Sequence, residues 1–365
     1  MAVAVKPIKQ AQNRVERQLS RTMVEKVPLN LLEKAFGIKE PLTLDGRTMD
    51  PLLRVVCEAN KNKPSLEKLP LTESRQVYEH IVETLDSPFP KSVIKRDRTV
   101  TLQSELEGPR DVRIRIYHKA QNSHERKPVM VFFHGGGWVI GSIESTDRLC
   151  ALLTDLLDHI VVSVNYRLTP ENPFPAPQYD AVDAFTWIQS HAAHFGGDPD
   201  RVYAAGDSAG GQLATVVAQQ TTLLNRPGPC LQVMIYPGVD RKQRGESHRT
   251  LGEGFLLNRG MLDWFTDTFI PHHREDDNIL ASPIEADQAL LAKLPPALIT
   301  TAGFDLLRDD GANYADKLRE AGVATTYIEF EHLAHGYVTM TGAVPAARQA
   351  IVTTAEQISL MLASL

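Results

Sequence analysis

The stretch GDSAGG, residues 206–211, joins an apolar, strand-like run to a helix-like run. Two interpretations fit its serine: Ser208 is a nucleophile held on a sharp turn, or it is an ordinary polar residue in a glycine turn. Gly206 and Gly210 remove two Cβ atoms where the strand and the helix must approach closely, as a strained nucleophile elbow requires. The motif alone leaves both interpretations open, so the surrounding sequence has to decide between them.

From about residue 100 the chain alternates short apolar runs with longer helical patterns. The runs are rich in Val, Ile and Tyr, which is typical of strands buried on both faces of a sheet. We expect strands at 101–106, 112–120, 128–133, 159–166, 201–206, 230–236, 296–303 and 325–331, and helices at 144–157, 177–195, 310–322 and 345–365. This alternation predicts an α/β fold with a mostly parallel sheet covered by helices on both faces.

The first hundred residues look all-helical, with expected helices at 8–26, 28–36, 49–61 and 72–86. A second segment, at about 240–285, separates two expected strands by far more residues than one crossover helix needs. We therefore expect a helical cap region at 1–98 and a catalytic domain at 99–365 that carries a cap insertion at 240–285. The N-terminal helices and the insertion together would roof an active site.

The composition argues against several classes of function. A net charge of −6 and a pI near 6.1 argue against a general nucleic-acid-binding protein. No run approaches the roughly 18 consecutive apolar residues of a membrane-spanning helix, and the apolar start before Lys6 is too short for a secretory signal. Three cysteines far apart in the chain indicate free thiols in a reducing compartment, so we expect a cytoplasmic location.

A second glycine motif, HGGGW at 134–138, directly follows the expected strand 128–133. Successive glycines can present unencumbered backbone N–H groups, which an oxyanion hole needs at the place where negative charge develops. The competing interpretations are a flexible loop and a phosphate-binding loop. A phosphate-binding loop normally brings a lysine within the loop or at the start of the helix, and neither glycine motif has one.

A serine hydroxyl is a weak nucleophile near neutral pH and needs a base. Of the 12 histidines, His335 is the best placed, because it lies on a loop just past the expected strand 325–331 and is followed by Gly336. His332, three residues earlier, is its competitor. Most other histidines lie in helices or polar loops, where solvated or capping roles suffice.

The base in turn needs a carboxylate that orients it and stabilises the imidazolium. Asp305 follows the expected strand 296–303, whereas Asp309 and Asp310 come one helical turn later and are expected at the start of the next helix. The order Ser208, Asp305, His335 is the chain order expected of α/β-hydrolases.

Five stretches carry a family resemblance: HGGGWVIGS (134–142), NYRLTPENPFPA (165–176), GGDPDRVYAAGDSAGGQLA (196–214), GFDLLRDDG (303–311) and HLAHGY (332–337). With them the chain resembles the bacterial hormone-sensitive-lipase-like esterases, the family IV carboxylesterases of the α/β-hydrolase fold, over about residues 95–360. The resemblance implies hydrolysis of carboxylic esters without a cofactor or a metal. It also implies that the stretch 165–176 is a structural loop, with Tyr166, Arg167 and Glu171 as scaffold.

By the resemblance, Ser208 is the nucleophile, His335 the general acid and base, and Asp305 its orienting carboxylate. The oxyanion hole is expected from the N–H groups of Gly136, Gly137 and Ala209. The candidate substrate-binding residues are Trp138, Asp207 and Tyr337; for Trp138, lining the pocket and packing in the core are equally good interpretations. The expected substrate is a small-molecule ester with a short- to medium-length acyl chain, because a helical cap should restrict the pocket.

Residues 1–48 precede the usual start of the family, which corresponds to about Met49. They carry nine basic and five acidic residues, unlike the rest of the chain. This segment would tighten the cap, join two subunits or lie on the surface. Together with exposed strand edges, it makes a homodimer a reasonable expectation, with no nucleic acid and no membrane as partner.

Three other functions compete with the serine carboxylesterase. An amidase or deacetylase would use the same triad. A small-molecule receptor with a decayed triad is disfavoured, because Ser208, Asp305 and His335 are all present. A metal enzyme is remote, because there is no HExxH motif and the stretch PHHRED at 271–276 is too polar and loop-like to prefer a ligand role.

Overall fold

An eight-stranded sheet forms the centre of the molecule in the computed structural model, which describes residues 27–61, 63–104, 107–120, 125–271 and 276–365. The sheet order is β10-β9-β8-β7-β5-β6-β4-β3. The strands are β3 (Val93–Leu102), β4 (Arg110–Lys119), β5 (Lys127–Phe133), β6 (Ile160–Asn165), β7 (Gly197–Asp207), β8 (Gln232–Ile235), β9 (Ala297–Phe304) and β10 (Thr325–Ala334). Strands β6 to β10 and β5 run parallel, and β4 is antiparallel to both β3 and β6. The predicted α/β class with a mostly parallel sheet is confirmed.

Helices cover both faces of the sheet because its central strands are apolar on both sides. In β5, Met130 and Phe132 pack in a cluster with α5 (Asp147–Leu157) and α12 (Pro345–Ala363). Val131 and Phe133 point the other way, into a cluster with α6 (Ala176–His191) and α7 (Ala209–Leu223). A third cluster joins α11 (Arg308–Glu320) to β8 and β9 on the α7 side. The carboxyl ends of β7, β9 and β10 consequently meet at one edge of the sheet.

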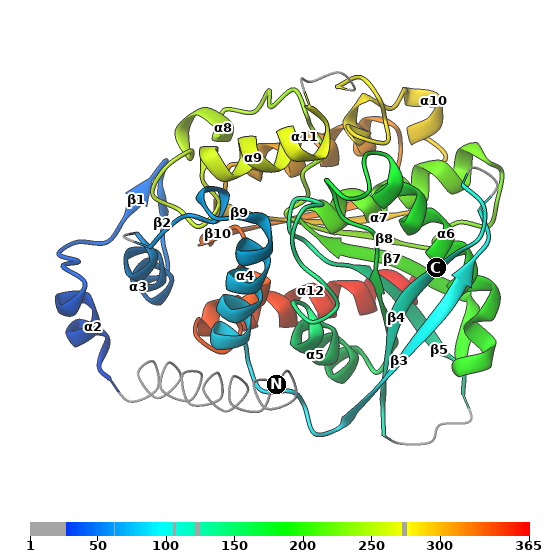
Figure 1. Ribbon diagram of the computed structural model, residues 1–365, viewed down its shortest axis with the longest axis horizontal. Coiled ribbons are helices and arrows are strands. Elements are labelled where there is room, and N and C mark those ends of the chain that lie inside the picture. Colours follow the sequence, from blue (N-terminus) through cyan, green and yellow to red (C-terminus); the bar gives the residue numbers. More distant parts are fainter. Residues whose placement is uncertain (1–26, 62, 105–106, 121–124, 272–275) are drawn as a thin grey trace.

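The N-terminal elements lie beside β10, at the edge opposite β3 (Figure 1). They are α2 (Leu29–Ala35), β1 (Thr43–Leu44), β2 (Arg47–Thr48), α3 (Pro51–Asn60), η1 (Leu66–Lys68) and α4 (Leu71–Leu85). Asp50 caps α3 by accepting a 3.0 Å bond from the Leu53 N–H, and its own N–H donates to the His332 carbonyl at 2.9 Å. Arg47 forms an ion pair with Glu329 of β10. These contacts tie the N-terminal elements to β10 and so to the central sheet.

The helices predicted at 28–36, 49–61 and 72–86 are confirmed within a few residues, and the helix predicted at 8–26 lies outside the described residues. The prediction that the first hundred residues are all-helical is wrong. Residues 43–48 form a hairpin, and β3 begins at Val93 rather than near residue 101. The strand was missed because its side chains from Ile94 to Thr99 are exposed, so it lacks the apolar alternation of a half-buried strand. It also straddles the predicted domain boundary at residue 98.

The predicted cap insertion contains α8 (Ser247–Thr250), α9 (Arg259–Phe269) and η4 (Pro283–Glu285), and α10 (Gln288–Leu291) follows it. Ser247 anchors α8 to the start of α11: its hydroxyl donates to the Leu306 carbonyl at 2.6 Å, and its N–H donates to Asp309 at 2.9 Å. Figure 1 shows α9 and α4 on the same side of the molecule, near the labelled ends of β9 and β10.

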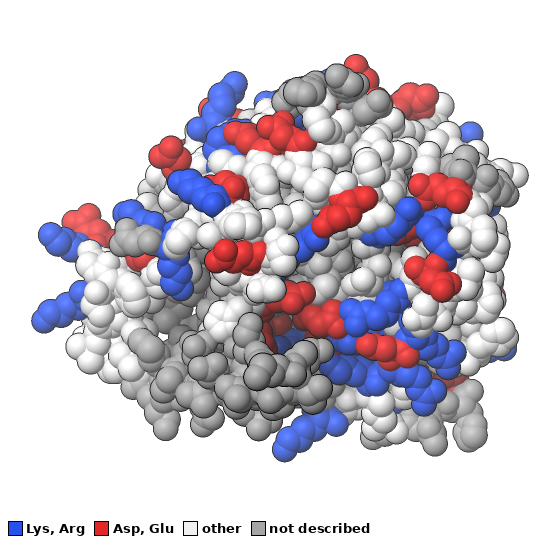
Figure 2. All heavy atoms as spheres, in the orientation of Figure 1, with Lys and Arg blue, Asp and Glu red and all other residues white. Residues whose placement is uncertain are grey.

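Charged side chains of both signs are interspersed on the surface shown in Figure 2. Around β3 and β4 they form a network in which Arg115 contacts Asp97 and Asp147. Within the described ranges, no helix combines the length and the apolarity needed to cross a membrane.

Candidate active site

Ser208 stands on the sharp turn between β7 and α7. Its backbone has φ 56° and ψ −119°, a conformation that a residue with a side chain adopts only under strain. A Cβ on Gly206 would lie 2.3 Å from the Gly210 carbonyl oxygen, and one on Gly210 would lie 1.9 Å from the Phe133 carbonyl oxygen. Glycine is therefore required at both positions if the helix is to start so close to β5 and β7.

A chain of two hydrogen bonds connects Ser208, His335 and Asp305. The Nε2 atom of His335 lies 3.0 Å from the Ser208 hydroxyl, and its Nδ1 lies 2.7 Å from an Asp305 carboxylate oxygen. Asp305 is buried, and its other oxygen accepts a 2.9 Å bond from the Leu307 N–H. The carboxylate is thus held by a backbone donor on one side and by the imidazole on the other, which fixes the ring toward the serine.

The competing candidates lie elsewhere. The His332 side chain is exposed, and its carbonyl accepts the Asp50 N–H. Asp309 accepts the Ser247 N–H at 2.9 Å, and Asp310 lies 2.7 Å from His248 Nε2. The structure therefore brings together the three residues that the chain order predicted and places their competitors in contacts that hold the cap insertion and the N-terminal elements.

The glycine motif at 134–138 lies directly beside Ser208. Two positive φ angles, 116° at Gly136 and 59° at Gly137, turn this loop, and within the described residues neither N–H donates to an acceptor of the protein. Both glycines line the same cavity as Ser208. Ala209, the first residue of α7, presents its N–H at the helix start, where backbone donors are free. The three predicted oxyanion donors therefore lie around one serine.

The loop is held in place by buried polar groups. The Gly135 N–H donates to Asp207 at 2.8 Å, and the Tyr166 hydroxyl donates to the His134 carbonyl at 2.7 Å. Asp207 is buried, and this burial raises its pKa to about 6 against the counteracting bond from Gly135. Arg167 pairs with the buried carboxylate of Asp180, so the contacts of Tyr166 and Arg167 are those of scaffold residues.

The three candidate substrate-binding residues have different surroundings. Trp138 both lines a cavity next to Ser208 and packs its ring against Phe269, with ring centroids 4.0 Å apart. Asp207 lines the larger cavity while holding Gly135. Tyr337 is fully buried, and its hydroxyl lies 3.1 Å from that of Thr300; its position favours a packing role over contact with substrate.

Two cavities meet at Ser208. The larger has a volume of about 630 Å³ and is walled by α3, α4, the segment 254–261 and the His335 loop. The smaller, of about 40 Å³, lies between Ser208, Ala209, the segment 238–243 and α9. The N-terminal helices and the predicted insertion thus both contribute walls next to the serine.

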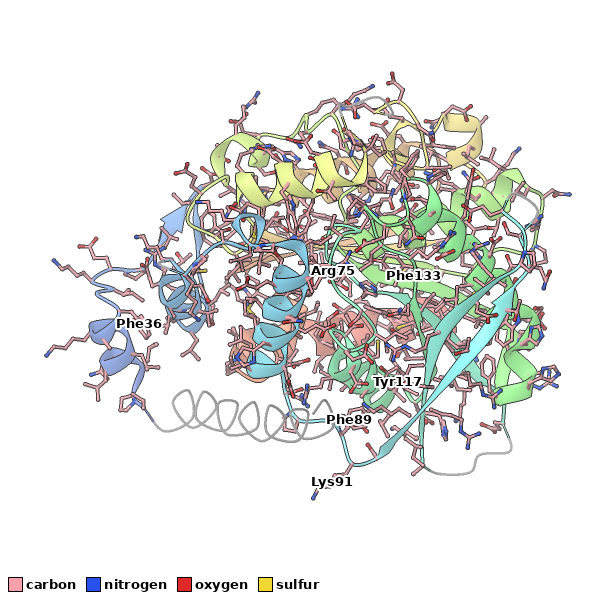
Figure 3. All side chains as sticks on the ribbon, in the orientation of Figure 1. Phe36, Arg75, Phe89, Lys91, Tyr117 and Phe133 are labelled. Atoms are coloured by element: carbon pink, nitrogen blue, oxygen red, sulfur yellow. The ribbon has the colours of Figure 1, made fainter. Side chains whose placement is uncertain are left out.

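Residues of α4 and α9 that the sequence did not single out also shape the site. Arg75 extends from α4 toward the sheet (Figure 3) and donates to the carbonyls of Val139 and Thr169 at 2.9 and 3.1 Å. It also forms a two-bond ion pair with Glu171. Phe265 of α9 packs so closely on the glycine loop that a Cβ on Gly137 would meet its ring at 2.2 Å. No local pattern marks either residue, because both act across the cap interface.

The described part of the chain holds no group of three or more His, Cys, Asp or Glu side chains placed to bind a metal ion. His272 and His273 of the PHHRED stretch lie outside the described residues.

The chain is similar to several known proteins. A sequence model of the α/β-hydrolase fold matches residues 130–339. The carboxylic ester hydrolase LipN of Mycobacterium tuberculosis is 35% identical over 303 residues, which cover 81% of this chain and 79% of LipN. An ethyl acetate hydrolase of Pseudomonas putida is 35% identical over 67% of this chain and 76% of its own length. The crystal structure of a thermostable esterase from Pseudomonas putida superimposes with a TM-score of 0.81 at 29% identity, covering 88% of this chain and 99% of that one.

Proposed function

The chain belongs to the α/β-hydrolase fold family, among the hormone-sensitive-lipase-like esterases, and is a carboxylic ester hydrolase; from this premise we propose that Ser208, His335 and Asp305 carry out the reaction. The observation that carries the proposal is the continuous contact from the Asp305 carboxylate through the His335 ring to the Ser208 hydroxyl, with distances of 2.7 and 3.0 Å. The strained backbone of Ser208 aims that hydroxyl into the cavity.

In the first half of the reaction, the Ser208 oxygen attacks the ester carbonyl carbon while His335 Nε2 takes the hydroxyl proton. Negative charge develops on the former carbonyl oxygen of the tetrahedral intermediate. The imidazolium then gives its proton to the alkoxy oxygen, the carbon–oxygen bond breaks and the alcohol leaves. Asp305 orients the ring and stabilises its positive charge throughout.

In the second half, water attacks the acyl group that is bonded to Ser208, and His335 takes a proton from that water. The second tetrahedral intermediate collapses with release of the carboxylic acid, and the proton returns to the serine oxygen. The net reaction consumes one ester and one water and yields one acid and one alcohol, with no redox change and no co-reactant.

The oxyanion is proposed to bind the N–H groups of Gly136, Gly137 and Ala209. Three observations support this assignment of the donors. The glycine loop is turned by its positive φ angles, the Gly136 and Gly137 N–H groups donate to no acceptor among the described residues, and Ala209 is the first residue of α7. One such donor is worth about 10²–10³ in rate in other hydrolases. Asp207 acts one step away, by fixing the preceding Gly135 N–H.

Short- to medium-length acyl chains are the proposed preference. The small cavity beside Ser208 and the relative named for ethyl acetate support it. The homodimer and the cytoplasmic location stay predictions from the sequence.

Steady-state hydrolysis of p-nitrophenyl acetate by Ser208→Ala tests the proposal. We expect kcat/KM to fall by at least about 10³, because no other group supplies the nucleophile. Ser190→Ala, which alters an exposed serine in α6, is the matched control and should retain full activity. Circular dichroism checks that both variants fold. A folded Ser208→Ala variant with most of its activity would refute the assignment.

A further inference from the structure

The two cavities at Ser208 share a narrow partition. Four residues line both cavities: Gly137, Ser208, Leu257 and Phe265. Leu257 and Phe265 are buried and belong to the cap insertion, so their side chains separate the two spaces next to the nucleophile. An ester bound at Ser208 has two substituents on its reacting group, the acyl chain and the alcohol, and the site offers them two spaces of very different size.

The position of the general acid decides which substituent enters which space. His335 and the following Gly336 line the larger cavity, whereas among the described residues that line the smaller one neither appears. The leaving alkoxy oxygen has to come within hydrogen-bond reach of His335 Nε2 to receive its proton. The alcohol must therefore leave on the side of the larger cavity.

Ala209 marks the opposite side. Ala209 lines the smaller cavity, together with Gly238 and Leu262, and does not line the larger one. Of the three proposed oxyanion donors, Gly136 lines only the larger cavity, Gly137 lines both and Ala209 lines only the smaller, so the carbonyl oxygen points at the partition. With the alkoxy oxygen turned toward His335, the acyl chain is left on the side of the smaller cavity. We propose that the smaller cavity is the acyl site and the larger cavity the alcohol site, so that the enzyme acts on esters of short acids with large apolar alcohols. This inference rests on the proposed roles of Ser208 and His335.

The smaller cavity limits the length of the acid. A cavity needs roughly 10–15 Å³ of free volume to hold one water-sized group. A volume of about 40 Å³ therefore accepts about three non-hydrogen atoms beyond the carbonyl carbon, as in a butanoyl group. Its apolar walls include Trp138, Leu262, Phe265 and Leu307, which are all buried.

The polar residues around the smaller cavity are only partly paired: Arg241 Nη1 and His248 Nδ1 are buried and have no hydrogen-bond partner among the described residues. His248 lies 2.7 Å from Asp310, Asp240 pairs with Arg244, and Arg241 pairs with Asp276. An acyl group in this space would meet these polar side chains as well as the apolar walls.

The larger cavity suits an extended apolar group. At about 630 Å³ it lies within the range of pockets that hold drug-sized ligands. Its apolar lining comes from both parts of the cap: Cys57, Val77, Ile81, Val82, Leu85, Leu256 and Met261. Charged residues such as Arg54, Glu58 and Lys61 also line it. A long alkyl or an aryl alcohol fills this space, whereas an equally long acyl chain does not fit on the other side of the partition.

Two constitutional isomers, octyl acetate and ethyl octanoate, test the assignment directly. They have the same atoms and similar hydrophobicity but exchange the long chain between alcohol and acid. We expect kcat/KM for octyl acetate to exceed that for ethyl octanoate by about tenfold or more, since even one methylene that does not fit costs about tenfold. Proton release in a pH-stat measures both. Equal rates, or a preference for ethyl octanoate, would overturn the inference.

Cavity variants locate the acyl site with p-nitrophenyl acetate, butanoate and hexanoate. Gly238→Ala adds a Cβ that contacts only Leu307, at 3.4 Å, so it should fold and lower the butanoate-to-acetate activity ratio by about tenfold. Leu262→Ala should raise the hexanoate-to-acetate ratio by a similar factor. Ile81→Ala widens only the larger cavity, and should change the alcohol preference while leaving the acyl ratios unchanged.

A change of the acyl ratios in Ile81→Ala with no change in Leu262→Ala would place the acyl chain in the larger cavity and refute the assignment. Failure of this assignment can be told apart from failure of the proposed catalytic mechanism. Ser208→Ala should abolish hydrolysis of both isomers whichever one the unaltered enzyme prefers.

Discussion

The buried carboxylate of Asp207 makes a quantitative prediction about stability. It directly precedes Ser208 in the chain, accepts the Gly135 N–H at 2.8 Å and is only 3% exposed. Burial raises its pKa from 3.8 to about 6, while the Gly135 bond, the proximity of His335 and the Tyr236 hydroxyl work in the opposite direction. Asp207→Asn keeps an oxygen acceptor for Gly135 and removes the charge.

Whether acid stabilises or destabilises the fold through Asp207 depends on whether the folded or the unfolded chain binds the proton at the higher pH. As the pH falls from 8, the folded protein takes up this proton near pH 6, while the unfolded chain takes it up only near 3.8. Acidification therefore stabilises the fold through this group. Each pKa unit corresponds to about 1.36 kcal/mol, so the whole effect is about 3 kcal/mol, of which about 2 kcal/mol falls between pH 8 and pH 4.

Equilibrium urea unfolding, followed by tryptophan fluorescence at pH 4 and pH 8, measures the effect. The free energy of unfolding of Asp207→Asn minus that of the unaltered protein should be about 2 kcal/mol larger at pH 8 than at pH 4, so the variant is relatively more stable at pH 8. Asp267→Asn, which changes an exposed carboxylate in α9, is the control and should show no such difference. If Asp207→Asn and the unaltered protein respond equally to pH, burial does not penalise this charge and the reasoning fails.

Four further substitutions probe the proposed catalytic carboxylate, the turn at Ser208 and the contacts of α4. Asp305→Asn should lower kcat by about 10³–10⁴ with little change in KM, measured with p-nitrophenyl acetate, because the imidazolium loses its counter-charge; a fall below tenfold would contradict that role. Gly210→Ala forces a Cβ to 1.9 Å from the Phe133 carbonyl oxygen, and should lower the free energy of unfolding by about 1–3 kcal/mol and kcat with it; unchanged thermal unfolding would refute the steric argument. Arg75→Ala should lower the free energy of unfolding in urea by more than Glu171→Ala does. The Arg75 variant leaves two backbone carbonyls without their donor, whereas the Glu171 side chain is 52% exposed and its ion pair is worth at most about 1 kcal/mol. The reverse order would show that the ion pair dominates.

Buried elements were predictable from the sequence, and exposed ones were not. Strand β5 matches its prediction within one residue because apolar side chains on both faces leave an unbroken run. Strand β3 was missed at its first half because residues 94–99 are exposed at an edge of the sheet. The hairpin at 43–48 does have a signal in the sequence, an Asp-Gly pair: Asp45 and Gly46 adopt φ 51° and 77°, as an Asp-Gly turn favours.

The proximity of the three proposed catalytic residues was predictable because each lies at the end of a strand in a parallel sheet. Such ends meet at one edge, so chain order and glycine motifs suffice to bring Ser208, Asp305 and His335 together. The contributions of Arg75 and Phe265 were not predictable. They depend on how α4 and α9 dock over the sheet, and that docking leaves no periodicity in the local sequence.

The reaction of the protein with a fluorophosphonate, followed by peptide mass spectrometry, tests the central claim most directly. The account predicts one phosphonyl group per chain, on the peptide that contains Ser208, with esterase activity lost in proportion to the labelling. Activity that survives full labelling of Ser208, or inactivation by a label on a different residue, would contradict the assignment of Ser208 as the nucleophile.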